Sequence, residues 1–355
     1  MNQIKGKNYS VYFEKNGYDK LDEIVKQNSY SSIYVLVDSN TNKECIPIFK
    51  KRISNSFSFI VIEIDEGEEN KNINSCQKVW TILSDKGGDR KSLVINLGGG
   101  VITDIGGFIA STFKRGIDFI NIPTTLLSMV DASIGGKTGI DFGNLKNQIG
   151  VINDPKLVVI DPFFLNTLSI KELRNGYSEM LKHGLITDKK YWDKVSTILL
   201  EKKEPGIDEI FTSIKIKNKI VLDDPFEKNK RKVLNFGHTV GHAIESFFMN
   251  SQTHNKLSHG KSIAIGMIIE AYISCDLCKL KISEAKEIKN VFNSIFEIVN
   301  LTENDCDQII SLLKHDKKNS HGKTNFVLIE SIGNALIDIQ VPVKNIKKGF
   351  EFYLS

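Results

Sequence analysis

Two histidines four residues apart, His238 and His242, stand in the apolar stretch RKVLNFGHTVGHAIE at residues 231–245. Imidazole can bind a metal ion or exchange a proton near neutral pH, so both residues are candidates for chemistry. In a helix, this spacing brings two side chains to one face, one turn apart. One ring could then hold an ion while the other reaches a reacting molecule. The spacing alone leaves a pair of buried core histidines equally open.

A second candidate site is the run of three glycines, Gly98 to Gly100, in SLVINLGGGVITDIGG. Glycine lets backbone N–H groups approach a phosphate closely, and a helix that follows presents its positive N-terminus. The run is not the GxGxxG dinucleotide fingerprint, because Thr103 stands where the last glycine would be. Asp38 ends the apolar run IYVLVD, where a carboxylate can accept hydrogen bonds from ribose hydroxyls. These features indicate a nucleotide site; a tight strand-to-helix turn without a ligand is the alternative.

The stretch IPTTLLSMVDASIGGKTGID at residues 122–141 adds a loop of glycines, hydroxyl side chains and one lysine, Lys137. Its GGKT resembles a P-loop only superficially, because the first glycine of GxxxxGK[ST] would fall at Asp131. The pattern therefore excludes a P-loop ATPase. The composition of the loop still suits phosphate binding.

These residues lie on two kinds of secondary structure. Apolar runs in the first ~165 residues predict buried strands that alternate with amphipathic stretches such as residues 70–86, which is typical of a parallel sheet covered on both faces. From about Thr167 onward, segments with a 3.6-residue period predict a mostly α-helical region, with two short strands near the end. The predicted strands are 32–38, 57–65, 92–98 and 118–123, and the predicted helices are 170–187, 189–203, 207–222, 232–249, 259–281 and 284–298. We expect two domains, residues 1–166 and 167–355.

The composition bounds the kind of protein. The chain has 355 residues, 41% of them hydrophobic and 25% charged, with a net charge of +4, which argues against a nucleic-acid coat. Its apolar runs fall short of the ~20 residues of a membrane span, and residues 1–17 show no signal peptide. The five cysteines form no disulfide framework, and the Cys275–Cys278 pair fits a half-buried helix face better than a metal site. We therefore expect a cytoplasmic protein.

Seven motifs together resemble the 3-dehydroquinate synthase family of the sugar-phosphate cyclase superfamily. They occur in the order GGGVITDIGGFIASTFKRG, IPTTLLSMVDASIGGKTGID, LKNQIG, NGYSEMLKHG, RKVLNFGHTVGHAIE, HGKSIAIGM and HDKKN, and the resemblance covers roughly residues 30–330. It implies a Rossmann-like α/β domain that binds NAD, followed by the helical domain with a divalent metal, zinc or cobalt. It also implies a lyase of the shikimate pathway to aromatic amino acids. That lyase converts 3-deoxy-D-arabino-heptulosonate 7-phosphate (DAHP) to 3-dehydroquinate and phosphate.

The resemblance assigns different roles to the two histidines. It implies that His238 binds the metal together with Glu179 and His259, and that His242 faces the substrate. One carboxylate and two imidazoles leave a coordination position open, as in other catalytic zinc sites.

The remaining site residues also come from the resemblance. For NAD it implies Asp38, Asn40, Glu68, Lys71, Gly99, Gly100, Val101, Asp104, Thr124, Thr125, Lys137, Lys146 and Thr167. For the substrate it implies Asp131, Lys137, Asn147, Lys182, Lys217, Glu227, Arg231, Asn235, His242 and Lys318. It further implies that Arg115 reaches the neighbouring subunit's phosphate site, so we expect a homodimer.

Two departures from the family pattern and three rival interpretations remain. The family motif HGE reads HGK here, with Lys261 in place of the glutamate, and the family motif KYG reads KHG, with His183 in place of the tyrosine. Neither change removes a metal ligand. The rivals are another sugar-phosphate cyclase, a metal-dependent polyol dehydrogenase, and a non-catalytic NAD-binding or zinc-scaffold protein. The presence of Lys217 and Arg231 favours a substrate with a carboxylate, which arginine can bind at two points.

Overall fold

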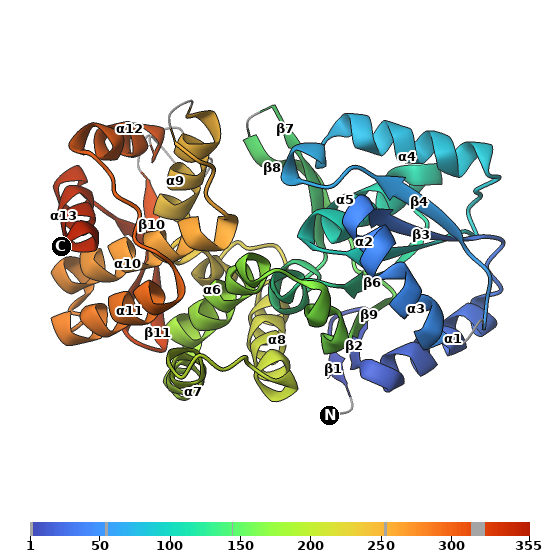
Figure 1. The fold of residues 1–355 in the computed structure, drawn as a ribbon, viewed down its shortest axis with the longest axis horizontal. Coiled ribbons are helices and arrows are strands. Elements are labelled where there is room, and N and C mark those ends of the chain that lie inside the picture. Colours follow the sequence, from blue (N-terminus) through green and yellow to red (C-terminus); the bar gives the residue numbers. More distant parts are fainter. Residues whose placement is uncertain (1–2, 54–55, 144, 252–253, 314–323) are drawn as a thin grey trace. The chain divides into compact units, whose positions relative to one another are not determined.

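The computed structural model describes residues 1–355 except 1–2, 54–55, 144, 252–253 and 314–323 (Figure 1). The chain divides into two compact units, Met1–Leu173 and Arg174–Ser355, which we call the N-terminal and C-terminal units. The division lies seven residues beyond the boundary expected at residue 166. Between the two positions lie the end of a 3₁₀ turn, η4 (Pro162–Thr167), and the first residues of helix α6 (Ile170–Thr187).

The N-terminal unit is built on a seven-stranded sheet with the strand order β1-β2-β9-β6-β5-β3-β4. All neighbouring strands are parallel except β1 and β2, which are antiparallel. The strands are β1 (Ile4–Lys5), β2 (Ser10–Phe13), β3 (Ile33–Asp38), β4 (Ile60–Ile64), β5 (Leu93–Gly98), β6 (Asp118–Pro123) and β9 (Leu157–Ile160). The parallel sheet expected from the apolar runs is therefore confirmed, with a short antiparallel edge.

Helices cover both faces of this sheet, which explains why its central strands are apolar throughout. On one face, α4 and α5 pack on Tyr34, Leu36 and Val94. On the other face lie α1 and α3, where α1 contacts Val159 of β9 (Figure 1). The helices and turns of this unit are α1 (Glu14–Asn28), α2 (Ser39–Glu44), α3 (Ile46–Ile53), η1 (Glu68–Asn70), α4 (Ile73–Asp85), α5 (Gly100–Thr112), η2 (Phe113–Arg115) and η3 (Ser128–Ala132).

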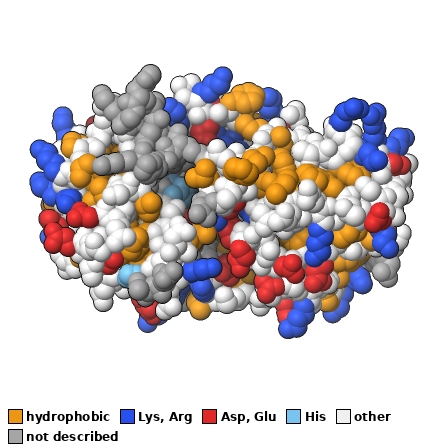
Figure 2. All heavy atoms as spheres, turned by 90° about the horizontal axis from the view of Figure 1, so that it is seen from above, with side chains coloured by type: hydrophobic (Ala, Val, Ile, Leu, Met, Phe, Trp, Pro, Cys, Tyr) orange, Lys and Arg blue, Asp and Glu red, His pale blue; other side chains and the backbone are white. Residues whose placement is uncertain are grey.

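A separate hairpin lies between β6 and β9 along the chain and is not part of the seven-stranded sheet. Strands β7 (Lys137–Phe142) and β8 (Leu145–Ile152) pair with each other in antiparallel register. The hairpin leaves apolar side chains exposed, among them Phe142 and Leu145, and apolar side chains gather on the face that Figure 2 shows.

The C-terminal unit is mostly helical. Its longest helix, α10, is buried along most of its length, so neighbours surround it on several sides. The elements of this unit, besides α6, are α7 (Lys189–Leu200), α8 (Ile207–Asp223), η5 (Lys230–Asn235), α9 (His238–Asn250), α10 (His259–Cys278), α11 (Ile282–Ile295), α12 (Glu303–Leu313), β10 (Asn325–Ser331), β11 (Asn334–Gln340) and α13 (Val343–Leu354). No helix in the described part of the chain combines the length and apolar composition that crossing a bilayer needs.

One predicted helix was wrong in extent. The sequence predicted a single helix over residues 232–249, but the structure has the 3₁₀ turn η5, a break at Phe236 and Gly237, and then α9. Gly237 adopts φ +78°, a left-handed conformation that ends the turn and that favours glycine. The break makes His238 the first residue of a helix, and this sets the geometry of the site.

Candidate functional site

Three side chains from three helices of the C-terminal unit converge at one point. Glu179 comes from the middle of α6, His238 begins α9 and His259 begins α10. Each offers one ligand atom, and these atoms lie within 4.8 Å of one another. The Nε2 atom of His238 is 3.7 Å from Oε1 of Glu179, whose side chain is buried. Two imidazoles and one carboxylate form the donor set of many catalytic zinc sites, so these residues fit a divalent transition metal.

The neighbours of both imidazoles favour this use. Nδ1 of His238 lies 3.2 Å from the carbonyl oxygen of Phe236. Because a carbonyl can only accept a hydrogen bond, Nδ1 carries the proton and Nε2 is left as a lone-pair donor toward Glu179. Nδ1 of His259 lies 3.3 Å from Oε2 of Glu245, which is the carboxylate–histidine pairing common around bound metals.

The sequence analysis did not single out Glu245. It lies on α9, seven residues after His238 and therefore two turns along the same helix face. This spacing is a signal that could have identified it.

His242 lies beside the three converging residues. Its ring centroid is 5.2 Å from that of His238 and 5.9 Å from that of His259. His242, Glu245 and His259 also bring ligand atoms within 4.8 Å of one another. His259 is thus shared by two possible donor groups. Of these two groups, the one with Glu179 contains both His238 and His259, each of which starts a helix.

Lys182 and His183 follow Glu179 by about one helical turn. Lys182 is almost fully buried, and its ammonium forms an ion pair with Oε2 of Glu179. The buried His183, a departure from the family pattern, lies with Nδ1 2.7 Å from the hydroxyl of Ser213 on α8. His183 is therefore bonded to a neighbouring helix.

Lys261, the other departure, is half-buried in the first turn of α10. Burial lowers its pKa, and the nearby carboxylate of Glu297 opposes that effect.

The segment from Asp224, which follows α8, to Asn235, which ends η5, carries three residues expected at the substrate: Glu227, Arg231 and Asn235. Asp224 at the end of α8 accepts hydrogen bonds from the backbone N–H groups of Asn229 at 2.7 Å and Arg231 at 3.1 Å. Burial alone would raise the Asp224 pKa, but these and one further N–H group hold it below the ordinary value. Within this segment, Nδ2 of Asn235, at the end of η5, donates to Oε1 of Glu227 at 2.7 Å.

Different contacts hold Glu227, Arg231 and Lys217 in place. Glu227 has φ +57°, an uncommon conformation for a non-glycine residue, which the hydrogen bonds around it stabilise. The guanidinium of Arg231 is almost fully buried and donates to the carbonyl of Pro225 at 2.7 Å. Lys217 is buried on α8, which packs against η5. Lys318 lies outside the described residues.

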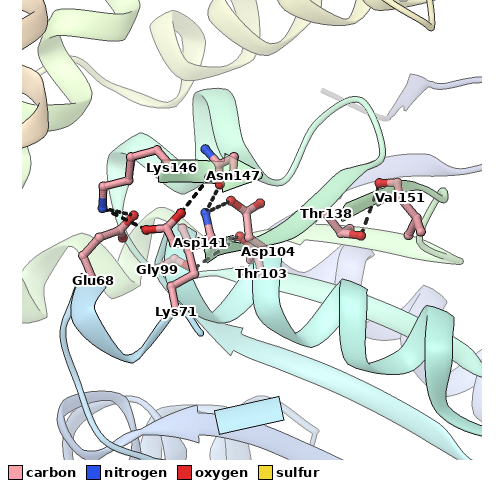
Figure 3. A network of polar contacts seen from close by, with 11 residues as sticks. Glu68, Lys71, Gly99, Thr103, Asp104, Thr138, Asp141, Lys146, Asn147 and Val151 are labelled. Atoms are coloured by element: carbon pink, nitrogen blue, oxygen red, sulfur yellow. Dashed lines mark hydrogen bonds and ion pairs between the residues drawn. The ribbon is translucent and has the colours of Figure 1, made fainter. Parts of the chain in front are cut away.

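A second polar cluster lies in the N-terminal unit, where side chains from η1, α5 and the β7–β8 hairpin point toward one another (Figure 3). Lys71 is almost fully buried, with Nζ 2.5 Å from Asp104 and 2.6 Å from Oδ1 of Asn147. Lys146 contacts Glu68 at 2.9 Å. Burial alone would lower the Lys71 pKa, but Asp104, Glu68 and other carboxylates raise it above the ordinary value. The lysine is therefore charged at neutral pH.

Asp141 completes this cluster and was missed by the sequence analysis. Its carboxylate accepts the backbone N–H of Asn147 at 2.6 Å and contacts Lys146 at 3.1 Å. Asn147 itself has φ +49°, so this hydrogen bond supports an uncommon backbone conformation. The structure therefore brings together five residues expected at the cofactor or the substrate: Glu68, Lys71, Asp104, Lys146 and Asn147.

The glycine run lies where β5 ends and α5 begins. Gly99 is the N-cap residue of α5 and has no side chain to cap it, so the first N–H groups of the helix face outward from the strand edge. A Cβ on Gly99 would come within 3.0 Å of the Thr125 side chain, so the loop after β6 lies directly beside this turn. The residues Gly99, Gly100, Val101, Thr124 and Thr125 therefore occupy one edge of the sheet. This arrangement fits the pyrophosphate of a dinucleotide.

Other expected residues of this unit are more scattered. Asp38 ends β3 as expected, but its Oδ1 accepts the N–H of Thr41 at 2.7 Å and so caps α2, the helix on which Asn40 lies. Thr167 lies 4.0 Å from the sulfur of Cys45. The remaining three are Asp131 in η3, Lys137 at the start of β7, and Arg115, which is exposed at the end of η2 and has φ +70°.

Comparison with known proteins gives these arrangements a context. Residues 61–175 match the family model for the N-terminal part of 3-dehydroquinate synthase, and residues 176–319 match that for its C-terminal part. The 3-dehydroquinate synthases of Parabacteroides distasonis and Clostridium botulinum are each 37% identical to this chain. The former aligns over 94% of both chains, the latter over 94% of this chain and 95% of its own.

The fold is shared with a further enzyme. A 2-epi-5-epi-valiolone synthase from Streptomyces hygroscopicus, solved with NAD⁺ and Zn²⁺ bound, superposes with a TM-score of 0.84 at 24% identity. The match covers 99% of this chain and 98% of that one. At this identity the similarity shows the fold alone. The matches along both halves of the sequence and the 37% identity to known members lead to one conclusion: the chain belongs to the 3-dehydroquinate synthase family.

Proposed function

We propose that this chain converts DAHP to 3-dehydroquinate and phosphate, with NAD and a divalent metal ion, zinc or cobalt, as cofactors. The observation that carries the proposal is the convergence of Glu179, His238 and His259, with both imidazoles oriented by hydrogen-bond acceptors, in a chain of this family. When bound, the metal would supply a Lewis acid at the substrate hydroxyls, and NAD would accept and return a hydride.

The chain's own residues would bind and orient the substrate. The buried guanidinium of Arg231, with Lys217 on the adjacent helix, suits the substrate carboxylate, because a guanidinium can donate two parallel charged hydrogen bonds. His242 lies beside the metal ligands, where it can donate to the leaving phosphate or hold a proton near it. Lys182 would offset the charge of Glu179.

The cofactor would be held in the N-terminal unit. The uncapped start of α5 and the adjacent Thr124–Thr125 loop suit the pyrophosphate. Lys71, held charged by Asp104, would supply a fixed positive group near this edge. The proposal includes a homodimer in the cytoplasm, to which Arg115 contributes across the subunit interface.

A phosphate-release assay tests the proposal. Purified protein with DAHP, zinc and NAD well below the substrate concentration should release phosphate in many turnovers per NAD. Accumulation of NADH equal to product would instead indicate a polyol dehydrogenase. Phosphate release only from a sugar phosphate that lacks the carboxylate would indicate another cyclase.

A matched pair of variants links the activity to the donor set. His259→Ala should abolish turnover and lower the bound zinc, whereas His254→Ala, which changes a histidine outside this donor set, should retain both. Full zinc occupancy in His259→Ala would remove His259 from the metal site.

A further inference from the structure

Helix α9 begins without a cap from its own sequence. Its N-cap residue, Gly237, has no side chain, and His238 is the first helical residue. The missing cap is supplied by Glu270 of α10, which is fully buried. Its two carboxylate oxygens accept the N–H of Gly237 at 2.6 Å and the N–H of Val240 at 3.1 Å. One carboxylate thus binds the backbone on both sides of His238.

The helix that supplies this carboxylate also carries another of the converging residues. His259 begins α10, and Glu270 follows it by 11 residues, or about three turns. The two hydrogen bonds of Glu270 therefore fix the start of α9 relative to the helix of His259. The helices have little freedom to slide, because a Cβ on Gly266 would lie 2.0 Å from the Gly237 carbonyl oxygen.

A second buried acceptor joins α10 to α6. Oδ1 of Asn175 accepts the N–H of Gly260 at 3.1 Å, and Gly260 directly follows His259. Asn175 lies one turn before Glu179 on α6. The contact is close, since a Cβ on Gly260 would lie 2.5 Å from Cα of Asn175. Asn175 thus links α6, which carries Glu179, to the start of α10 at His259. Glu270 links α10 to the start of α9 at His238.

We propose that Glu270 and Asn175 are positioning residues for the metal, setting the distances among Glu179, His238 and His259 through the backbone. The inference rests on the proposed function and gives a role to two residues to which the family resemblance assigned none. It differs from the roles of Phe236 and Glu245, which orient the imidazole rings themselves. Metal–ligand distances tolerate only about ±0.2 Å, so a loosened helix start weakens binding even when each ligand is present.

Zinc affinity of the metal-free protein tests the role of Glu270, measured by competition with a chromophoric chelator. Glu270→Ala should raise the zinc Kd by about 10- to 100-fold, the usual effect of losing a residue that orients ligands. Glu270→Gln keeps one acceptor oxygen and should fall between Glu270→Ala and the unaltered chain. The matched control is Glu209→Ala, which removes a buried carboxylate that accepts the N–H of Gly206 at the start of α8, a helix without a metal ligand. Its Kd should stay within about twofold.

The same measurement tests Asn175. Asn175→Ala should weaken zinc binding, and Asn175→Asp, which keeps an acceptor for the Gly260 N–H, should restore most of it. Circular dichroism and unfolding curves without metal show whether each variant is folded.

Several outcomes overturn the proposal. A folded Glu270→Ala with unchanged zinc Kd refutes it, as does an equal loss in Glu209→Ala. If Glu270→Ala does not fold, an unchanged Kd in Glu270→Gln refutes it instead. If the unaltered chain binds no zinc, both the proposed metal centre and this inference fail, whereas zinc binding that is insensitive to Glu270 leaves the proposed function intact.

Discussion

Replacing Gly266 with alanine should separate the two helices that carry His238 and His259. The added Cβ would lie 2.0 Å from the carbonyl oxygen of Gly237 and 2.7 Å from the amide nitrogen of Gly241. Ordinary contact begins near 3.4 Å, so the carbonyl must retreat by about 1.4 Å, the difference between 3.4 and 2.0 Å. Both atoms belong to the backbone, and no change of rotamer can relieve the overlap.

The expected loss of stability follows from two opposing effects. Overpacking of a buried contact costs about 1–3 kcal/mol, and a backbone contact belongs at the upper end of that range. Alanine returns about 1 kcal/mol, because it favours the helix over glycine. The free energy of unfolding of Gly266→Ala should therefore fall by about 2 kcal/mol, and Tm by about 4–8 °C. Zinc affinity should fall as well, since a shift of about 1.4 Å far exceeds the tolerance of metal–ligand distances.

Urea unfolding and thermal melts, each with and without zinc, measure both effects. The matched control is Ser262→Ala, one turn earlier on α10, where the same residue replaces a buried hydroxyl that makes no hydrogen bond within the described part of the chain. Its unfolding free energy should change by less than about 0.5 kcal/mol. A Gly266→Ala protein as stable as the control, or more stable, would refute the close approach of α9 and α10.

Three further predictions concern the segment from Asp224 to Asn235 and the polar cluster around Lys71. Arg231→Ala should lower kcat/KM on DAHP by about 30- to 1000-fold, equivalent to about 2–4 kcal/mol, while zinc binding is retained. Lys230→Ala, which changes an exposed neighbour, should keep near-normal kcat/KM. Full activity in Arg231→Ala would remove Arg231 from the carboxylate site. Lys71→Met should lower the free energy of unfolding by about 3 kcal/mol, because it leaves Asp104 without its buried ion pair; an unchanged urea midpoint would contradict this. Because the pKa of Asp224 is lowered in the folded state, its carboxylate stabilises the fold above about pH 4, and this stabilisation is lost as the pH falls through the folded pKa. Asp224→Asn should therefore be less stable at pH 7, and its free energy of unfolding should fall less steeply toward acid pH. Equal slopes for the variant and the unaltered chain would exclude this contribution.

The sequence was informative wherever a pattern is local. Apolar runs predicted β3, β5 and β6, because both faces of a central parallel strand are covered. The period of 3.6 predicted α6 over its full length. It failed before His238, since the apolar residues of the 3₁₀ turn continue the same spacing and only the φ of Gly237 marks the break. A backbone angle leaves no trace in hydrophobic periodicity.

The site shows the same limit. The three converging residues could be named from motifs, because each lies in a distinctive stretch of sequence. The roles of Asn175 and Glu270 could not be inferred in this way, although Asn175 begins the same motif as Glu179. Each accepts a hydrogen bond from a backbone N–H at the start of another helix that is far away along the chain. Asp141 lies within a quoted motif, yet its contact with Asn147 depends on the turn between β7 and β8. Which acceptor meets which donor is decided by packing.

The strand order of the N-terminal unit also has a consequence for how the chain folds during its synthesis. Strand β2 lies beside β9, and Val11 pairs with Val158, 147 residues later. At ~5–20 residues per second, a ribosome needs roughly 7–30 s to make the intervening chain, so β2 stays unpaired on one side for that time. The four strands β3 to β6, whose partners are made within about 90 residues of one another, can assemble first. Strand β2 is thus incorporated into the sheet after β3 to β6, although it is made before them.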